Sequence, residues 1–189
     1  MTDINNIKTI LEGNHELIGI LKIVESLHLA DSWLCAGTIR NYIWDILSNK
    51  KELTCYSDID VIFYDPNITY EETLELEQDL IQRYPNYNWE LKNQVYMHIH
   101  NPNTAVYTSS YDAISKFPET CTAIGARINK GNIELIAPHG IEDLVNFGVK
   151  PTPFFKNDSE RMALFIKRVT HKKWHLRWPQ LSIEDNNIM

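Results

Sequence analysis

Apolar residues recur three and four positions apart near the start of the chain. This spacing extends from Leu17 to Leu27 and follows Asn14, which can cap a helix. A shorter helix is expected before Gly13. The N-terminal helices together should cover about residues 4–29.

The next segment changes from a strand pattern to a helical pattern at a single glycine. Residues 32–36 form a short apolar run that ends at Gly37, and apolar residues then recur at helical spacing from Ile39 to Leu47. The pattern predicts a strand, a tight turn and a helix.

Strand patterns return after a polar loop. Residues 58–64 are rich in β-branched and aromatic side chains. Thr69 followed by Glu72 forms a capping box that opens a helix. The remaining expected strands are 87–99, 121–128 and 133–137, of which the last two form a hairpin with a glycine in its turn.

The C-terminal part is helical. Short helices are expected near 111–117 and 141–147, and a longer one begins near Asp158. About five strands in irregular alternation with helices predict an α+β fold with antiparallel pairing mixed into the sheet. We expect a single domain over 1–189, with N-terminal helices, a core at about 31–148 and a C-terminal helical segment at about 156–178.

Composition fits one globular domain of ordinary size. Of the 189 residues, 43% are hydrophobic and 23% are charged. No apolar run approaches the roughly 18 residues of a membrane span, and residues 1–11 lack the features of a secretory signal. Three dispersed cysteines, Cys35, Cys55 and Cys121, suit a reducing compartment and small core positions. We therefore expect a cytoplasmic protein with no membrane partner.

The charge is unevenly distributed. A net charge of −7 argues against a protein that mainly coats nucleic acid, because that task needs a basic surface. Residues 156–177 carry seven Lys or Arg against Asp158 and Glu160, a balance of +5, which leaves −12 elsewhere. This basic helix can meet an anionic substrate, although a solvated helix face is the more common meaning.

Two carboxylates share one face of a predicted strand. Asp58 and Asp60 are two residues apart, so their side chains point the same way. Adjacent carboxylates repel each other unless a cation lies between them, and Mg²⁺ prefers such oxygen ligands. Taken alone, the pair more often marks a strand start that faces water.

The glycine turn before them has the chemistry of an anion site. At Gly37 and Thr38, backbone N–H groups at a helix start and a hydroxyl can hold a phosphate. The simpler alternative is that Gly37 only makes the turn and Thr38 only caps the helix. The turn and the Asp58–Asp60 pair in this order, on neighbouring strands, favour a nucleoside triphosphate with its Mg²⁺.

These residues carry a family resemblance. Gly37-Thr38 followed by Asp58-Ile-Asp60-Val resembles the signature of the polymerase-β-like nucleotidyltransferase superfamily. A narrower likeness, to a family of small bacterial nucleotidyltransferase-like proteins, extends from about Trp33 to Trp178. Its segments are 36–45, 57–61, 89–94 with His98, 117–120 and 137–144.

The resemblance implies a fold and a set of catalytic carboxylates. It implies a twisted mixed sheet with helices mainly on one side and the active site on the open side. Asp58, Asp60 and a third acid on an adjacent strand would be the catalytic and metal-binding residues, with two Mg²⁺ ions for which Mn²⁺ can substitute. Glu90 is our choice for the third acid, and Glu134, on a later strand, is the alternative.

The resemblance also implies phosphate contacts. Gly37, Thr38 and Arg40 would hold the β and γ phosphates of the nucleotide. Arg40 can instead pair with Asp45 or Glu52 at the surface.

Two further side chains are pocket candidates. Gln94 and His98 lie beyond Glu90 on the predicted strand 87–99 and share its parity, so they should face the same side. They either line the substrate pocket or face water.

The activity implied is transfer of a nucleoside monophosphate from a nucleoside triphosphate to a hydroxyl of an unidentified small-molecule or protein acceptor. The alternative is a catalytically silent regulator that binds a nucleotide or a partner on the same scaffold. Transfer to an RNA end is less expected, because the body of the protein is acidic.

Overall fold

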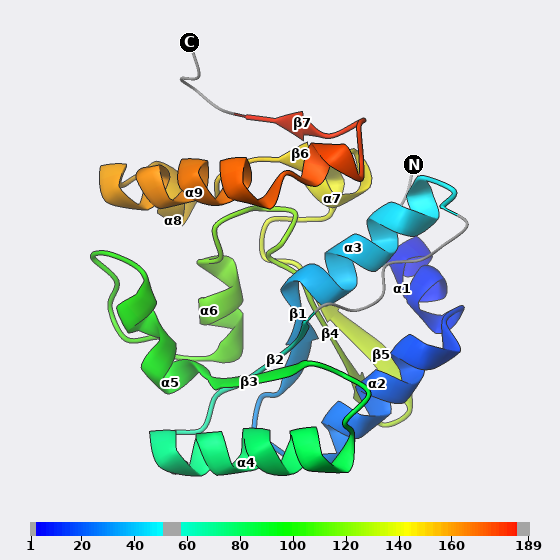
Figure 1. Ribbon diagram of the computed structural model, residues 1–189, viewed down its shortest axis with the longest axis vertical. Coiled ribbons are helices and arrows are strands. Elements are labelled where there is room, and N and C mark those ends of the chain that lie inside the picture. Colours follow the sequence, from blue (N-terminus) through cyan, green and yellow to red (C-terminus); the bar gives the residue numbers. More distant parts are fainter. Residues whose placement is uncertain (1–2, 51–57, 185–189) are drawn as a thin grey trace.

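A computed structural model describes residues 3–50 and 58–184 and contains a mixed five-stranded sheet (Figure 1). The strand order is β3-β2-β1-β4-β5; β2 and β3 are parallel and the other pairs are antiparallel. The predicted α+β fold with a mixed sheet is confirmed. The strands are β1 (Trp33–Cys35), β2 (Ile59–Phe63), β3 (Trp89–Asn93), β4 (Gly125–Asn129) and β5 (Asn132–Ile136).

Helices surround this sheet, and a short parallel ribbon pairs β6 (Gly148–Val149) with β7 (Ser182–Ile183). No helix in the described part of the chain has the length and apolar character needed to cross a membrane. The helices are α1 (Ile4–Glu12), α2 (His15–Ser26), α3 (Ala36–Leu47), α4 (Tyr70–Arg83), α5 (Gln94–Met97), α6 (Ser110–Ser115), α7 (Glu142–Val145), α8 (Pro153–Lys156) and α9 (Ser159–Lys172), with 3₁₀ turns η1 (His98–His100) and η2 (Trp174–Leu176).

Side-chain caps begin several of these helices. Asn14 accepts hydrogen bonds from two backbone N–H groups of α2, and Asp158 does the same for α9. Thr69 and Glu72 form both hydrogen bonds of the predicted capping box at α4. These local signals explain why the predicted helix starts are confirmed.

Alternation along β2 gives the sheet two different faces. Ile59, Val61 and Phe63 are fully buried in the main core with the side chains of α2 and α3. Figure 1 shows α1 and α2 on one side of the sheet and α6 on the other. On the α6 side only a small cluster forms, around Trp33, Ile62 and Ile114. Asp60, the one polar residue of β2, therefore faces the side of the sheet that carries the smaller cluster.

The predicted strand 87–99 is wrong beyond Asn93. The Asn93 side chain accepts a hydrogen bond from Val95 N and donates to the carbonyl oxygens of Asp65 and Ile68. These bonds cap α5 and turn the chain away from the sheet. The predicted strand 121–128 also starts late, because the N–H groups of Thr122 and Ala123 donate to Glu119 O in a turn and pairing begins at Gly125.

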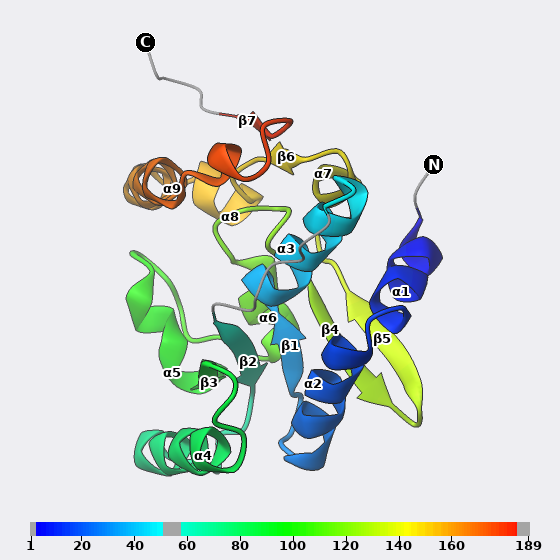
Figure 2. The ribbon, with the colours of Figure 1, turned by 45° about the vertical axis from the view of Figure 1, so that its right-hand side comes forward.

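A buried carboxylate fastens the C-terminal segment to α3. Asp45 has no exposed surface and accepts hydrogen bonds from Arg177 Nη2 at 2.9 Å and from Trp178 Nε1 at 2.9 Å. Beside it, the Trp44 ring packs edge-on against Trp174 and Trp178. These contacts set the position of η2, and with it the end of α9, relative to α3 (Figure 2).

We expect Asp45→Ala to lower the free energy of unfolding by about 2–4 kcal/mol, because it leaves Arg177 and Trp178 without their buried acceptor. Denaturant unfolding followed by tryptophan fluorescence measures this loss. Asp79→Ala is the matched control, since Asp79 pairs with Arg83 on the exposed face of α4, and it should change stability by less than about 0.5 kcal/mol. Equal losses in both variants would contradict the anchoring role.

Candidate active site

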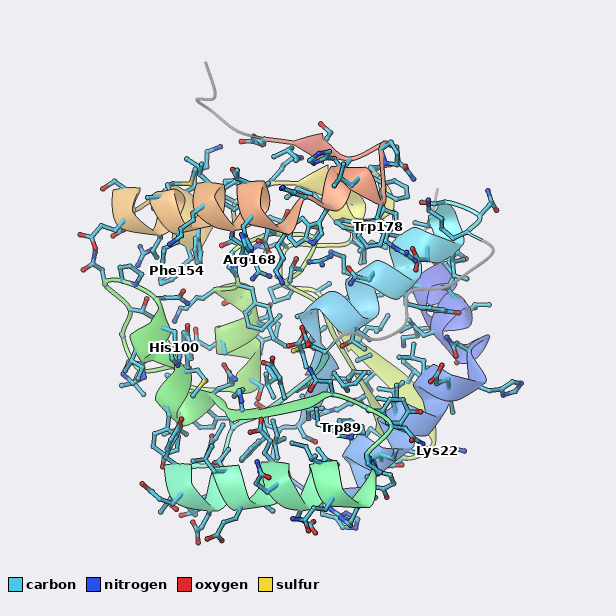
Figure 3. All side chains as sticks on the ribbon, viewed as in Figure 1. Lys22, Trp89, His100, Phe154, Arg168 and Trp178 are labelled. Atoms are coloured by element: carbon cyan, nitrogen blue, oxygen red, sulfur yellow. The ribbon has the colours of Figure 1, made fainter. Side chains whose placement is uncertain are left out.

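A cavity of about 410 Å³ opens where β2, β3, the start of α3 and the end of α9 meet. It unites acidic side chains of the sheet with basic side chains that come from distant parts of the chain. Figure 3 shows Arg168 on the side of α9 that faces the sheet. The lining residues are Ala36, Gly37, Thr38, Arg40, Asn41, Asp58, Asp60, Glu90, Arg168, Lys172 and Trp174.

Asp60 and Glu90 are direct neighbours on parallel strands. The register of β2 and β3 places Asp60 opposite Glu90, and both line the cavity. Burial raises the pKa of Asp60 to about 6, and the negative charges of Glu90 and Asp58 add to this, while Arg40 and Arg168 oppose it. The described lining holds as many basic side chains as carboxylates, so burial, rather than an excess of negative charge, is the main cause of the raised pKa of Asp60.

Asp58 lines the same cavity but is turned partly aside. Its Oδ1 accepts a hydrogen bond of 2.7 Å from Asn88 Nδ2. Within residues 3–50 and 58–184, no three His, Cys, Asp or Glu side chains are grouped to hold one metal ion. Mg²⁺, however, usually takes only one or two protein carboxylates and completes its shell with substrate phosphates and water. The adjacent carboxylates of Asp60 and Glu90 fit that requirement.

The first turn of α3 presents backbone N–H groups at the cavity. Helix α3 has no side-chain cap, and Ala36 adopts a left-handed φ of 55° where the strand passes into the helix. A Cβ atom on Gly37 would lie 3.7 Å from Asp60 Oδ2 and would fill the space between the helix start and the carboxylate. Glycine thus leaves this space open at a helix end of the kind that can bind an anion.

Thr38 links the start of α3 to the segment that carries Asp58 and Asp60. Its hydroxyl donates to Asp58 O at 3.0 Å and accepts from Asp60 N at 3.3 Å. The hydroxyl proton is therefore directed to β2, and Thr38 holds the start of α3 against the carboxylate strand.

Arg40 lies inside the protein, with its guanidinium group over two indole rings. Its guanidinium carbon is 4.1 Å from the Trp174 ring centre and 4.9 Å from that of Trp44. It donates hydrogen bonds to Thr122 Oγ1 and Asn41 Oδ1. The expected alternative pairing with Asp45 is wrong, because Arg177 and Trp178 occupy that carboxylate; the other alternative, Glu52, lies outside the described residues.

Arg168 and Lys172 complete the cavity, and our sequence interpretation did not assign them. Arg168 Nε donates at 2.7 Å to Oε1 of Glu119, which has no exposed surface, while the other oxygen of Glu119 has no hydrogen-bond partner in the described part of the chain. Glu119 thus fixes Arg168 at the cavity wall. The basic run 156–177 was the only signal that pointed to these two residues.

Comparison with known proteins identifies the family. A model of a nucleotidyltransferase family matches residues 22–183. The chain belongs to this nucleotidyltransferase family. No curated protein sequence matches it significantly.

Solved structures share the fold of this nucleotidyltransferase. It is 48% identical to a protein whose NMR structure is described as revealing a CCA-adding enzyme head domain, with a TM-score of 0.90 and 97% of each chain covered. A CCA-adding enzyme with ATP (13% identity, TM-score 0.53) and an apo tRNA-processing enzyme (15%, 0.50) share the fold over 95% and 89% of this chain. The chain spans only 42% and 43% of those two proteins.

The family match and the 48% identical structure confirm the predicted polymerase-β-like fold. The expectation that nucleic acid is an unlikely partner finds no support in them, because the similar proteins are described as CCA-adding and tRNA-processing enzymes.

Three expected site residues of the nucleotidyltransferase lie away from the cavity. Gln94 and His98 are absent from the described lining, because β3 ends at Asn93 and the alternation of strand side chains does not continue to them. Glu134 lies on β5 at the opposite edge of the sheet from β3, where Arg127 Nη2 contacts its Oε2 at 2.7 Å. The structure therefore favours Glu90 over Glu134 as the third acid.

Two cysteines of the nucleotidyltransferase are core residues, as expected. Cys35 and Cys121 are buried, and burial raises the pKa of both thiols, that of Cys121 to about 12. Neither is therefore a ready nucleophile. Cys55 lies outside the described residues.

Asp60→Asn should stabilise the metal-free nucleotidyltransferase at pH 7.5. The pKa of Asp60 is about 6 in the folded protein against an ordinary 3.8, so ionised Asp60 opposes folding above pH 6, by up to about 3 kcal/mol. Thermal unfolding in EDTA should show a melting temperature several degrees higher for the variant. The difference in melting temperature between the variant and the wild type should disappear as the pH falls from 6 to 4. An equal difference at both pH values would show that the ionisation of Asp60 is not its cause.

Proposed function

We propose that this nucleotidyltransferase acts in the cytoplasm and moves a nucleoside monophosphate from a nucleoside triphosphate to an acceptor hydroxyl, with Mg²⁺. The observation that carries the proposal is the single cavity that holds the Asp60–Glu90 pair beside the uncapped start of α3. Carboxylates for a divalent cation and N–H donors for phosphates are both needed to bind a Mg²⁺-nucleotide.

Each side chain has a role that follows from its place. Asp60 and Glu90 would hold Mg²⁺, with Asp58 joining them once its carboxylate leaves Asn88. When bound, Mg²⁺, for which Mn²⁺ can substitute, neutralises phosphate charge and lowers the pKa of the acceptor hydroxyl. The N–H groups of Gly37 and Thr38 would face the terminal phosphates, and the remaining basic side chains of the cavity are Arg40, Arg168 and Lys172.

The reaction follows from this arrangement. The acceptor oxygen attacks the α-phosphorus in line, a new P–O bond forms, and the bond to the bridging α–β oxygen breaks. Pyrophosphate leaves with the electron pair of that bond, and a carboxylate oxygen of Glu90 takes the hydroxyl proton. Positioning and charge neutralisation would supply most of the rate, which suits a cavity whose described lining includes no Ser, Cys or His.

The acceptor class includes nucleic acid. The 48% identical relative is described as a CCA-adding enzyme head domain, which supports an RNA end beside the small-molecule and protein acceptors first expected. This chain spans less than half of the length of the two larger proteins named above.

Calorimetric titration of the four ribonucleoside triphosphates tests the donor site without knowledge of the acceptor. We expect binding that requires Mg²⁺ and is weakened at least about 100-fold in Asp60→Asn, because that variant removes a metal ligand from the cavity. Lys22→Ala, an exposed change on α2, should bind as the wild type does. Absence of binding by all four triphosphates would contradict the proposal and favour a regulator that has kept only the scaffold.

Glu90→Gln and Glu134→Gln form a matched pair for the third acid. In the presence of Mg²⁺, Glu90→Gln should lower the rate of pyrophosphate release at least about 100-fold, whereas Glu134→Gln should retain it. The reason is that Glu90 lines the cavity and Glu134 pairs with Arg127 at the far edge of the sheet. The reverse order of effects would show that the wrong carboxylate has been assigned.

A further inference from the structure

A second cavity continues from the first along α9. It has a volume of about 410 Å³ and shares Arg168 and Lys172 with the candidate active site. Phe155 and Leu164 form part of its apolar wall. We call this second cavity the α9 groove; its basic residues are Lys167, Arg168, His171 and Lys172.

The four basic residues follow the helix repeat. They occupy two pairs of adjacent positions one turn apart, so their side chains lie side by side along α9. Among the residues that the structure describes, none with a carboxylate side chain lines the α9 groove. Its positive charge is therefore concentrated on one side of the helix, next to the catalytic cavity.

Three of the four basic residues of the α9 groove have no carboxylate partner in the described ranges, unlike four lysines elsewhere in the protein. In the described ranges, Lys92, Lys116, Lys150 and Lys156 each form an ion pair within 3.0 Å. Over the same ranges neither Lys167, His171 nor Lys172 has an ion pair or hydrogen bond from its side chain, and Arg168 pairs only with Glu119. The groove thus carries positive charge that the chain leaves available to a ligand.

The nucleotide donor does not account for all of this charge. Its triphosphate already has the start of α3, Arg40, Arg168 and Lys172 in the first cavity. The nucleoside part is neutral and gives Lys167 and His171 no charge to bind. These two side chains therefore indicate a second anionic group, held beside the donor.

The size of the groove and the charge of the rest of the protein limit that group. A volume of about 410 Å³ holds a ligand portion the size of one nucleotide. Outside residues 156–177 the chain carries −12, because −7 overall minus +5 in that segment leaves −12. A long polyanion would be repelled beyond the groove, so a single phosphate group fits best.

We propose that the α9 groove is the acceptor subsite, and that the acceptor carries a phosphate group which Lys167 and His171 bind while its hydroxyl reaches the Asp60–Glu90 pair. This inference rests on the proposed nucleotidyl transfer and names the chemistry of its acceptor. The phosphate can belong to a free phosphorylated small molecule or to the last phosphodiester of a nucleic-acid end.

Inorganic phosphate is the probe for the subsite itself. The protein is first loaded with Mg²⁺ and a triphosphate analogue whose α–β bridge is a methylene group, and phosphate is then titrated while ¹H–¹⁵N and histidine ring spectra are recorded. We expect saturable shifts at Lys167 and His171 with the analogue still bound. Lys167→Ala should weaken phosphate binding about three- to tenfold, and Lys167→Arg should retain it.

Lys22→Ala is the matched control. Lys22 is an exposed lysine on α2, far from α9 in Figure 3, and its removal changes the net charge by the same amount as Lys167→Ala. Equal weakening in both variants, absence of saturable shifts, or displacement of the analogue by phosphate would each overturn the proposal. Failure of the analogue to bind would instead overturn the donor site, so the two failures are distinguishable.

Two further ligands identify the source of the phosphate. A nucleoside 5′-monophosphate and a four-residue oligoribonucleotide with a free 3′ hydroxyl are each offered with a labelled triphosphate. The subsite is supported if Lys167→Ala has a higher KM for the ligand that accepts the label and keeps the kcat of the wild type. Equal transfer by Lys167→Ala and wild type at limiting acceptor would overturn it.

Discussion

The burial of a carboxylate directly beside a second one is the constraint around which the cavity is built. Asp60 lies opposite Glu90 in the register of two parallel strands; burial raises the pKa of Asp60, and the negative charge of Glu90 adds to this. Arg40 and Arg168 oppose this shift, yet the pKa of Asp60 remains about 6. A divalent cation bound beside Asp60 would therefore favour its ionised form.

The positions of Arg40 and Arg168 depend on residues that add no charge to the cavity lining. The guanidinium group of Arg40 packs over the rings of Trp44 and Trp174, and Glu119 holds that of Arg168. Thr122 lies in the turn that follows Glu119, so one short turn fixes both cations. The indole of Trp174 is in turn kept in place by the Asp45 anchor and the aromatic packing around it.

The parts of the site that arise from local sequence were predictable. Parity alone places Asp58 and Asp60 on one face, and a glycine between an apolar run and a helical pattern locates the start of α3. The same reasoning failed at Asn93. This residue ends β3 inside a strand-like run, because its side chain donates hydrogen bonds to the carbonyl oxygens of Asp65 and Ile68. The periodicity of the sequence does not reveal such bonds.

The parts that arise from distant contacts were not predictable from one sequence. Glu119 and Arg168 are 49 positions apart and meet only in the folded protein. The basic run around α9 indicated an anionic ligand. Which of its basic side chains face the sheet depends on the rotation of the helix. The hydrogen bonds of Asp45 and the packing of Trp44 against Trp178 help to set that rotation.

The order of the site residues along the chain has a consequence for synthesis. Both carboxylates of the central pair come from β2 and β3, which α4 joins within residues 59–93, whereas Arg168 and Lys172 come from α9. A ribosome thus delivers the acidic half of the site more than seventy residues before Arg168. The emerging β2–α4–β3 unit must tolerate its unbalanced charge until the C-terminal helix packs, so a chain stalled in between would present a negatively charged strand pair with an incomplete phosphate site.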